Sequence, residues 1–387
     1  MTEHPHHLNT WIELSEAAYT HNLDFFRRRI PRKTELSVVV KANAYGHGLK
    51  EITALAEKHK VDSYCVHSLT EALELRRLGT TKDILIMGPV PLDELEKVVF
   101  NNFRLAVFSL KILSSLSEIS QKMGRKAGIH LKLETGTYRL GINEAELPDF
   151  LKALKKAPSL VLEAAYTHFA NIEDTTDHSY AYYQMALFEK MIKLIRQTGF
   201  PQIKKHAACS AAALLFPETH FDMVRIGISQ YGLWPSRETF LSYKIKHTRN
   251  DIDVLQPALT WKARIGQIKK VPARHTIGYG RTFQTSRESK LAVLPIGYSD
   301  GYDRRLSNQS FVLLKGQRAP LRGRVCMNLI MVDITDIPVL KAGDEAVLIG
   351  TQGKEKVSAD FLAALSGTIN YEVVSRLSPH IPRLIVK

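Results

Sequence analysis

The sequence predicts an α/β fold in which a (β/α)8 barrel of the TIM type is followed by a mainly β C-terminal domain. Between residue 36 and about residue 230, short runs rich in β-branched residues alternate with amphipathic helical patterns, as in parallel βα units. Beyond residue 250, apolar and polar residues alternate as they do in strands. The chain has 387 residues, which is enough for two domains with separate cores.

Eight runs in the first part of the chain fit the strands of a barrel. An open doubly wound sheet is the alternative architecture, but eight βα alternations favour a closed barrel. Ser68 and Glu71 have the spacing of a capping box, which predicts a helix that begins there and ends at Gly79. The expected strands are residues 36–41, 63–67, 84–87, 105–108, 129–133, 161–166, 203–208 and 223–226.

The second part of the chain reads as a β domain with one helical interruption. Residues 236–256 are polar and poorly periodic, so we place the boundary there and expect domains at 10–245 and 246–387. Residues 1–15 could pack with the second domain. The expected strands are residues 259–265, 291–295, 311–314, 331–334 and 346–349, and the helical pattern covers residues 359–377.

Composition limits the classes of function. The net charge is +14, but the basic residues occur as scattered pairs without a dense run, so we expect no nucleic-acid partner. The three cysteines form no CxxC pair, which gives no indication of a metal site or a disulfide framework. No signal peptide and no apolar run of membrane-spanning length is seen, so we expect a cytoplasmic protein without a membrane partner.

Polar side chains fall at the carboxyl ends of the predicted barrel strands, where barrel enzymes carry their chemistry. Lys41 closes the first strand, Arg139 follows the fifth, His168 the sixth and Ser210 the seventh, and Arg225 closes the eighth. Each has an ordinary alternative: His168 as a satisfied core or surface residue, Arg225 as a structural ion-pair partner. Together they predict a site at this rim.

Lys41 and the segments after the last two strands suggest the chemistry of that site. An ammonium at the end of an apolar run is desolvated, which lowers its pKa and makes the amine a candidate Schiff-base former. Ser210 opens an alanine-rich helix, and Gly227 follows the last strand, which suits a phosphate dianion. Ser210 could equally be a routine helix N-cap.

Two motifs, VVVKANAYGHG around Lys41 and IGYGRTF around Tyr279, closely resemble those of alanine racemases, a pyridoxal phosphate enzyme family with a barrel and a β domain. The resemblance spans nearly the whole chain, through TGTYRLGI, YTHFA, HAACSAA, RIGISQYG, PIGYSDGYDR, GRVCMN and TINYEVVSR. It implies pyridoxal 5′-phosphate as cofactor, interconversion of L-alanine and D-alanine, and a homodimer with shared active sites. It also implies supply of D-alanine for peptidoglycan.

The resemblance also implies catalytic roles. Lys41 matches the cofactor lysine, which is the base on one face of the substrate, and Tyr279, from the second subunit, matches the base on the other face. Two bases on opposite faces of one Cα account for racemisation. His168 and Arg225 match the network that assists the tyrosine. Arg225 matches the residue at the pyridine nitrogen, where decarboxylases of the same fold carry an acidic residue.

The binding residues follow from the same motifs. Arg139 and the backbone of Met327 match the groups that bind the substrate carboxylate. Tyr298 and Tyr371 match the pair that narrows the entrance to the active site. Lys132 matches a position that is N-carboxylated in some members, and an ordinary strand lysine is the alternative. The phosphate contacts implied by the resemblance are Tyr45, Ser210, Gly227, Ile228 and Tyr371.

Departures from the family pattern leave the substrate range open. Thr137 and Tyr138 precede the arginine, Cys209 stands where asparagine is usual, and Asn328 where aspartate is common. The alternatives are a broader racemase acting on serine or larger amino acids, a decarboxylase of the same fold, and a non-catalytic cofactor-binding protein. Arg225 argues against the decarboxylase, and the β domain with Tyr279 argues against the non-catalytic protein.

Overall fold

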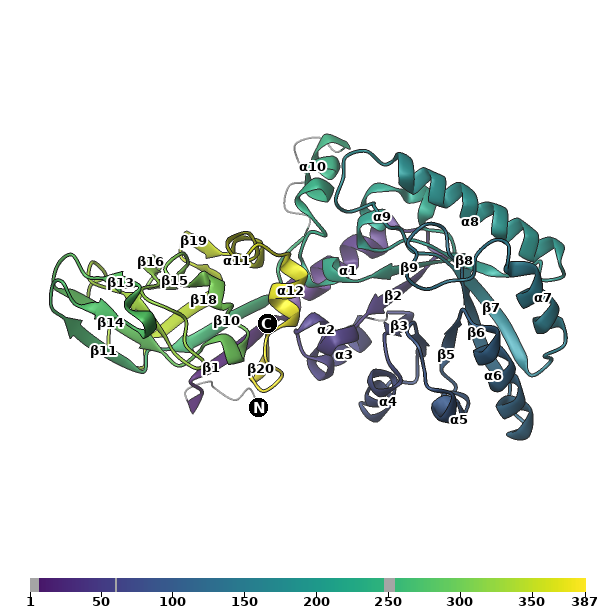
Figure 1. Cartoon of the computed structure of the whole chain (residues 1–387), viewed down its shortest axis with the longest axis horizontal. Helices are drawn as coiled ribbons and strands as arrows, with labels where there is room; N and C mark the ends of the chain where they lie inside the picture. The colour runs from purple at the N-terminus through teal and green to yellow at the C-terminus, as the bar shows by residue number, and fades with distance from the viewer. Residues whose placement is uncertain (1–6, 60, 247–254) are drawn as a thin grey trace. The chain divides into compact units, whose positions relative to one another are not determined.

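The computed structural model describes residues 7–59, 61–246 and 255–387. The chain forms two compact units (Figure 1). The barrel unit comprises Thr20–Lys41 and Ile52–Leu255, and the β unit comprises the N-terminal stretch through Tyr19, Ala42–Glu51 and Gln256–Lys387. Within the described ranges, no helix combines the length and the apolar character needed to cross a membrane.

The described part of the barrel unit contains an eight-stranded parallel sheet in the order β8-β7-β6-β5-β4-β3-β2-β9. The sheet closes because the amide of Asp222 donates to the Lys205 carbonyl at 3.1 Å and that of Arg225 to the Ala208 carbonyl at 3.0 Å. The predicted barrel is therefore confirmed. Its strands are β2 (Glu35–Val39), β3 (Ser63–Val66), β4 (Asp83–Ile86), β5 (Arg104–Val107), β6 (Ala127–Lys132), β7 (Leu160–Tyr166), β8 (Lys204–His206) and β9 (Met223–Ile226).

Amphipathic helices connect these strands. The capping box forms as predicted: Ser68 accepts from the Glu71 amide, and Glu71 accepts from the Ser68 amide. The segment predicted as an irregular boundary instead contains helix α10, whose apolar periodicity is too weak to reveal it. The helices are α1 (Glu16–Arg29), α3 (Leu49–Lys58), α4 (Leu69–Arg77), α5 (Leu95–Phe100), α6 (Leu110–Lys122), α7 (Leu147–Lys155), α8 (Ser179–Gln197), α9 (Ser210–Leu215) and α10 (Arg237–Lys246).

The β unit is built around a sheet whose main path runs β16-β15-β18-β10-β1-β20. Strand β1 (Thr10–Ser15) pairs antiparallel with β10 (Leu259–Arg264) and parallel with β20 (Arg383–Val386). Trp261, Leu313 and Ile330 lie in its apolar core. The remaining strands are β11 (Gln267–Val271), β12 (Thr276–Ile277), β13 (Phe283–Gln284), β14 (Ser289–Leu294), β15 (Phe311–Leu314), β16 (Gln317–Pro320), β17 (Ile330–Asp333), β18 (Glu345–Gln352) and β19 (Glu355–Val357).

The single helical pattern expected at residues 359–377 is in fact two helices, α11 (Ala359–Ser366) and α12 (Asn370–Ser375). They separate because Gly367 takes a left-handed conformation, with a φ of 62°, as the C-cap of α11. The prediction of one helix was wrong at this point. The break separates α12 from α11, and this short second helix carries Tyr371.

The first barrel strand is shorter than predicted. Strand β2 ends at Val39, and Lys41 instead opens α2 (Lys41–Tyr45), a turn in which Ala42, Asn43, Ala44 and Tyr45 all have φ between 52° and 54°. A left-handed backbone costs an L-residue about 1–2 kcal/mol, so four in succession need compensating contacts. One such contact is the Asn43 side chain, which accepts from the Leu49 amide at 2.8 Å.

Candidate active site

Lys41 lies two residues beyond the end of β2, where its side chain is half-buried. Burial, and then the positive charge of Arg139, lowers the pKa of the Lys41 ammonium, while the carboxylates of Glu71 and Glu173 oppose this. A lowered pKa increases the share of neutral amine at neutral pH. Lys41 is therefore suited to act as a nucleophile or as a proton acceptor.

Arg225 is buried inside the barrel, and its orientation is fixed on several sides. Its Nη1 atom lies 2.5 Å from Nδ1 of His206, and its Nη2 atom donates to the carbonyls of Thr167 at 2.8 Å and Ala207 at 3.0 Å. Only 4% of Arg225 is exposed. A guanidinium with this many partners keeps one position, which suits it to meet a bound ring.

The contact with Arg225 fixes the tautomers of two buried histidines. Because a guanidinium only donates, Nδ1 of His206 must accept, so its hydrogen is on Nε2. That atom lies 3.1 Å from Nδ1 of His130, whose own hydrogen is then on Nε2, 3.7 Å from Glu163. Burial lowers the pKa of both rings, and the charge of Arg225 adds to this at His206. Both histidines are therefore neutral at neutral pH.

Tyr166 and Lys132 also lie among the buried side chains around Arg225. We call His206, His130, Tyr166 and Lys132 the buried wall. The Tyr166 ring stacks on His206 with centroids 4.7 Å apart, and Nζ of Lys132 lies 4.7 Å from the centroid of the same ring. Burial, and then the charge of Arg225, lowers the pKa of Lys132 well below its ordinary value. The Lys132 amine is thus much easier to obtain in its neutral form than an exposed lysine.

The segment after β9 folds against Ser210. The Ser210 hydroxyl oxygen accepts from the amides of Gly227 at 3.0 Å and Ser229 at 3.4 Å, so its own proton remains available to a ligand. Ser210 is the first residue of α9 and not its N-cap, a position that Cys209 occupies without a side-chain capping bond. Ile228, also buried, opens the next turn, η4 (Ile228–Tyr231).

Arg139 and His168 are placed by neighbouring loops. The Glu134 carboxylate accepts from the amides of Gly136 and Thr137, both at 2.6 Å, and the Thr137 hydroxyl donates to the His168 carbonyl at 2.6 Å. Arg139 follows this turn and is exposed. Burial, followed by the charges of nearby cations with Lys132 first, lowers the pKa of His168 well below its ordinary value. His168 is therefore neutral at neutral pH.

Cys209 and Tyr138, two of the departures noted in the sequence, have distinct surroundings. Burial raises the pKa of the Cys209 thiol to about 12, and its Sγ atom lies 3.6 Å from Oε1 of Glu173. The thiol is therefore protonated and acts as a weak donor. Tyr138 is 83% exposed and has a φ of 51°. Among the described residues, no cluster of three or more His, Cys, Asp or Glu side chains could hold a metal ion.

The predicted site residues of the β unit lie on its turns. Tyr279 opens η5 (Tyr279–Arg281) and is 73% exposed, and Tyr298 opens η6 (Tyr298–Asp300). The Tyr298 amide donates to the Cys326 carbonyl at 3.0 Å, which places Tyr298 beside Met327. Tyr45 and Tyr371 also meet, with ring centroids 6.0 Å apart. Asn328, the third departure, is exposed and donates to the Ser299 hydroxyl.

Sequence patterns did not single out His206 and Tyr166, which contact Arg225, or His130, which contacts His206. A signal was present, because His130 and Lys132 are two residues apart on one strand and so share its face. His206 ends the seventh barrel strand in the same way that Lys132 ends the fifth. Polar residues at alternate positions near strand ends therefore marked the buried wall as well as the rim.

Comparisons with known proteins cover almost the entire chain. The model "Alanine racemase, N-terminal domain" matches residues 14–235, and "Alanine racemase, C-terminal domain" matches residues 258–385. An alanine racemase of Leptospira interrogans is 41% identical over 384 residues, which is 98% of this chain and 96% of the relative. One from Methanococcus maripaludis is 39% identical over 385 residues, with 99% of each chain covered.

Solved structures of alanine racemases are also similar to this chain over nearly its whole length. The alanine racemase of Bacillus anthracis with bound L-Ala-P has a TM-score of 0.90 at 35% identity and covers 98% of this chain and 95% of its own. The alanine racemase of Bartonella henselae with covalently bound pyridoxal phosphate has a TM-score of 0.85 at 27% identity, with 98% and 99% covered. Both extend over the barrel and the β sheets alike.

Proposed function

This chain belongs to the alanine racemase family, and we propose that it interconverts L-alanine and D-alanine with Lys41 and Tyr279 of the partner subunit as its two acid–base groups. The reaction class is isomerisation, and the cofactor is pyridoxal 5′-phosphate. The observation that supports this assignment most is the place of Lys41, two residues beyond β2 and next to the strand that carries Arg225, where burial also lowers the pKa of its amine.

The residues of the barrel unit suit this cofactor. Ser210 retains a hydroxyl proton, and the backbone of Gly227 and Ile228 lies beside it, which fits a phosphate dianion. Arg225 would meet the ring nitrogen and Lys41 the aldehyde carbon. In the β unit, Tyr45 and Tyr371 form the pair that would complete the phosphate site.

Two groups then move the proton. When bound, pyridoxal phosphate would supply an electron sink that makes the Cα proton of the amino acid acidic. Lys41 takes or returns a proton at Nζ on one face, and Tyr279 does so at its hydroxyl oxygen on the other. We assign to His168, which is neutral, the task of assisting the tyrosine.

Arg225 favours racemisation over competing reactions. A guanidinium does not give up its proton in proteins, so Arg225 would leave the ring nitrogen of a bound cofactor unprotonated. Its three hydrogen-bond partners inside the barrel keep it in that position. Held there, Arg225 would keep a bound ring a weaker electron sink, which would favour prompt return of the proton to Cα. Incubation with L-alanine in deuterium oxide should therefore yield deuterated D-alanine and no released carbon dioxide.

We further propose how the substrate is held. Arg139 and the backbone of Met327 would bind the carboxylate, and Tyr298 and Tyr371 would limit the size of the side chain. Lys132 would become N-carboxylated when its neutral amine attacks carbon dioxide, forming an N–C bond and releasing a proton. Carbon-13 NMR after incubation with labelled bicarbonate should show one carbamate signal, which the Lys132→Ala variant should lack.

A homodimer with shared active sites is part of the proposal. Tyr279, Tyr298 and Met327 are exposed by 73%, 43% and 56%, an unusual position for groups that would bind a small substrate unless a second subunit covers them. Lys41→Ala and Tyr279→Phe should each be inactive alone. Mixed dimers should regain about a quarter of wild-type activity, because half the dimers contain one intact site. Mixing that restores nothing would refute the shared site.

Cys209 and Asn328 favour one second candidate, a racemase of broader specificity, because both replace residues usual in the family. A racemisation screen over a panel of L-amino acids distinguishes an alanine-specific racemase from a broader one. We expect alanine to give the highest kcat/KM, and equal rates with serine would favour the broader enzyme. We place the protein in the cytoplasm, where D-alanine would supply peptidoglycan synthesis.

A further inference from the structure

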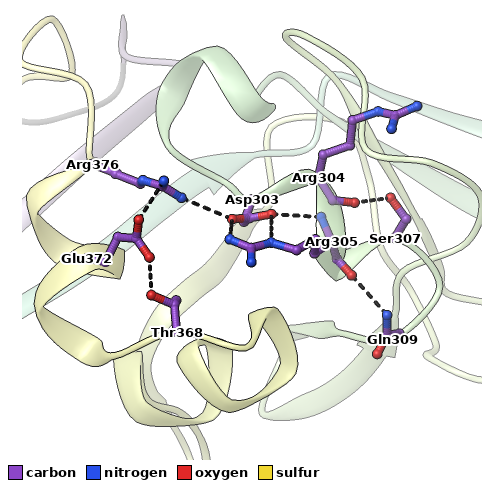
Figure 2. A network of polar contacts seen from close by, with 8 residues as sticks. All are labelled: Asp303, Arg304, Arg305, Ser307, Gln309, Thr368, Glu372 and Arg376. Carbon is purple, nitrogen blue, oxygen red and sulfur yellow. Dashed lines mark hydrogen bonds and ion pairs between the residues drawn. The ribbon is translucent and has the colours of Figure 1, made fainter.

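An ion-pair network in the β unit surrounds Asp303 (Figure 2). The Asp303 carboxylate accepts from the backbone amide of Arg305 at 2.8 Å and pairs with its guanidinium at 2.9 Å. It also pairs with Arg376 at 3.3 Å, and Arg376 in turn lies 2.5 Å from Glu372. Thr368 donates its hydroxyl to the same Glu372. We call these five residues the Asp303 network.

The carboxylate at the centre of this network is held in its charged form. The hydrogen bond from the Arg305 side chain, followed by its backbone amide and the charge of Arg376, lowers the pKa of Asp303, although partial burial opposes this. The Asp303 side chain is 19% exposed, whereas those of Arg305 and Arg376 are about half exposed. Asp303 is therefore the shared acceptor on which two cations converge.

On one side the network reaches α12. Glu372 follows Tyr371 directly, and Arg376 caps this helix. The opposite side of α12 packs on the segment that follows Lys41: a side chain at Gly46 would overlap the Val374 carbonyl. Helix α12 is thus held between this segment and Asp303, and its position sets that of the Tyr371 ring beside Tyr45.

On the other side the network reaches the Tyr279 turn. Asp303 caps η7 (Arg304–Leu306), and the two residues that follow make the connection. The Ser307 hydroxyl accepts from the Val325 amide at 3.0 Å. Asn308 accepts from the Gly323 amide at 2.6 Å and donates to the Thr282 hydroxyl at 3.1 Å. Thr282 is the C-cap of η5, the turn that Tyr279 opens.

We propose that Asp303 is a positioning residue for both active sites of the dimer: through Arg376 it places Tyr371 in its own subunit's site, and through η7 it places the Tyr279 that serves the partner's site. The inference rests on the proposed function, in which Tyr279 acts across the subunit interface. One carboxylate then has two separable effects. Loss of Asp303 would weaken phosphate binding by Tyr371 in its own subunit's site. It would also displace the Tyr279 that acts as the second base in the partner's site.

Mixed dimers of a Lys41→Ala chain and a Tyr279→Phe chain, purified through two different tags, separate these effects. Their one intact site takes Lys41 from the Tyr279→Phe chain and Tyr279 from the Lys41→Ala chain. Asp303→Asn on the Lys41→Ala chain should lower kcat about ten- to a hundredfold and leave the cofactor Kd unchanged. The same change on the Tyr279→Phe chain should raise the cofactor Kd about tenfold and leave kcat at saturating cofactor unchanged.

Two further variants sharpen the test. Arg376→Gln removes the link to α12 but keeps Asp303 paired with Arg305, so it should raise the cofactor Kd and not lower kcat. Glu355→Gln, which breaks the exposed ion pair with Arg318 elsewhere in the β unit, should change neither quantity. An inactive parent mixed dimer would refute the shared site and the proposal with it. An active parent in which Asp303→Asn has no effect, or the same effect on either chain, would refute the role of Asp303 alone.

Discussion

The two units hold their functional side chains by opposite means. In the barrel, Arg225 and Lys132 are 4% and 7% exposed, and neighbouring groups fix both their direction and their protonation. In the β unit, Tyr279 is 73% exposed, and its backbone is held in the turn η5 that it opens. Burial shifts the pKa of a side chain, whereas an exposed turn leaves its side chain accessible to another surface. A reaction that needs both kinds of group can take one from each unit.

The largest effect is expected at Lys41. Lys41→Ala should abolish cofactor colour and lower racemase activity by more than about 10⁴-fold, because it removes both the covalent anchor and one base. The exposed Lys50, nine residues along the chain, is the matched control, and Lys50→Ala should keep both properties. Absorption spectra and circular dichroism of the purified variants provide the measurement. A coloured, active Lys41→Ala variant would place the cofactor elsewhere.

Breaking the histidine contact with Arg225 should produce the next largest loss. His206→Phe leaves a buried guanidinium donor unsatisfied, which should lower the free energy of unfolding by about 1–3 kcal/mol and activity about tenfold. His220 is also buried, and its Nε2 atom contacts the Ala213 carbonyl and not Arg225, so His220→Phe should cost similar stability at full activity. Urea unfolding and initial rates compare the two. Equal activity in both variants would mean that the wall does not position Arg225.

The buried histidines should make the barrel sensitive to acid. His130 and His206 have lowered pKa values in the folded chain, so the unfolded chain binds more protons as pH falls through about 6.5. Stability is therefore full above that pH and declines below it, by about 1.4 kcal/mol per pH unit for each histidine. Urea unfolding at several pH values measures the slope. His130→Gln should make it shallower, and an unchanged slope would exclude His130 as a source.

The smallest effect concerns the left-handed turn that follows Lys41. Ala42→Gly should stabilise the chain by about 0.5–1 kcal/mol. Glycine removes the free-energy cost of the left-handed backbone in the folded chain, and this gain exceeds the free energy by which its greater conformational entropy stabilises the unfolded chain. Ala153→Gly in the right-handed helix α7 is the control and should destabilise by about 1 kcal/mol. Thermal unfolding distinguishes the two. Equal destabilisation by both would show that the turn carries no strain.

The barrel could be predicted from sequence because most of its strands are largely buried apolar runs, and the predicted ends lie within two residues of the observed ones. The turn after Lys41 could not, because Ala42, Asn43, Ala44 and Tyr45 contain no glycine to signal a left-handed backbone. The contact between His130 and His206 joins residues 76 positions apart on β6 and β8, the two strands that flank β7, so it depends on the strand order and not on the local sequence. Gly367, by contrast, was a readable signal for the break after α11.

Cα hydrogen exchange in the Tyr279→Phe variant in deuterium oxide tests whether Lys41 of one subunit and Tyr279 of the partner subunit each serve one face of alanine. If Tyr279 serves L-alanine and Lys41 serves D-alanine, exchange from L-alanine should fall about 10²–10⁴-fold while exchange from D-alanine continues at Lys41. The cofactor spectrum should be unchanged. Equal exchange from both enantiomers, or racemisation at the wild-type rate, would show that Tyr279 is not the base for L-alanine.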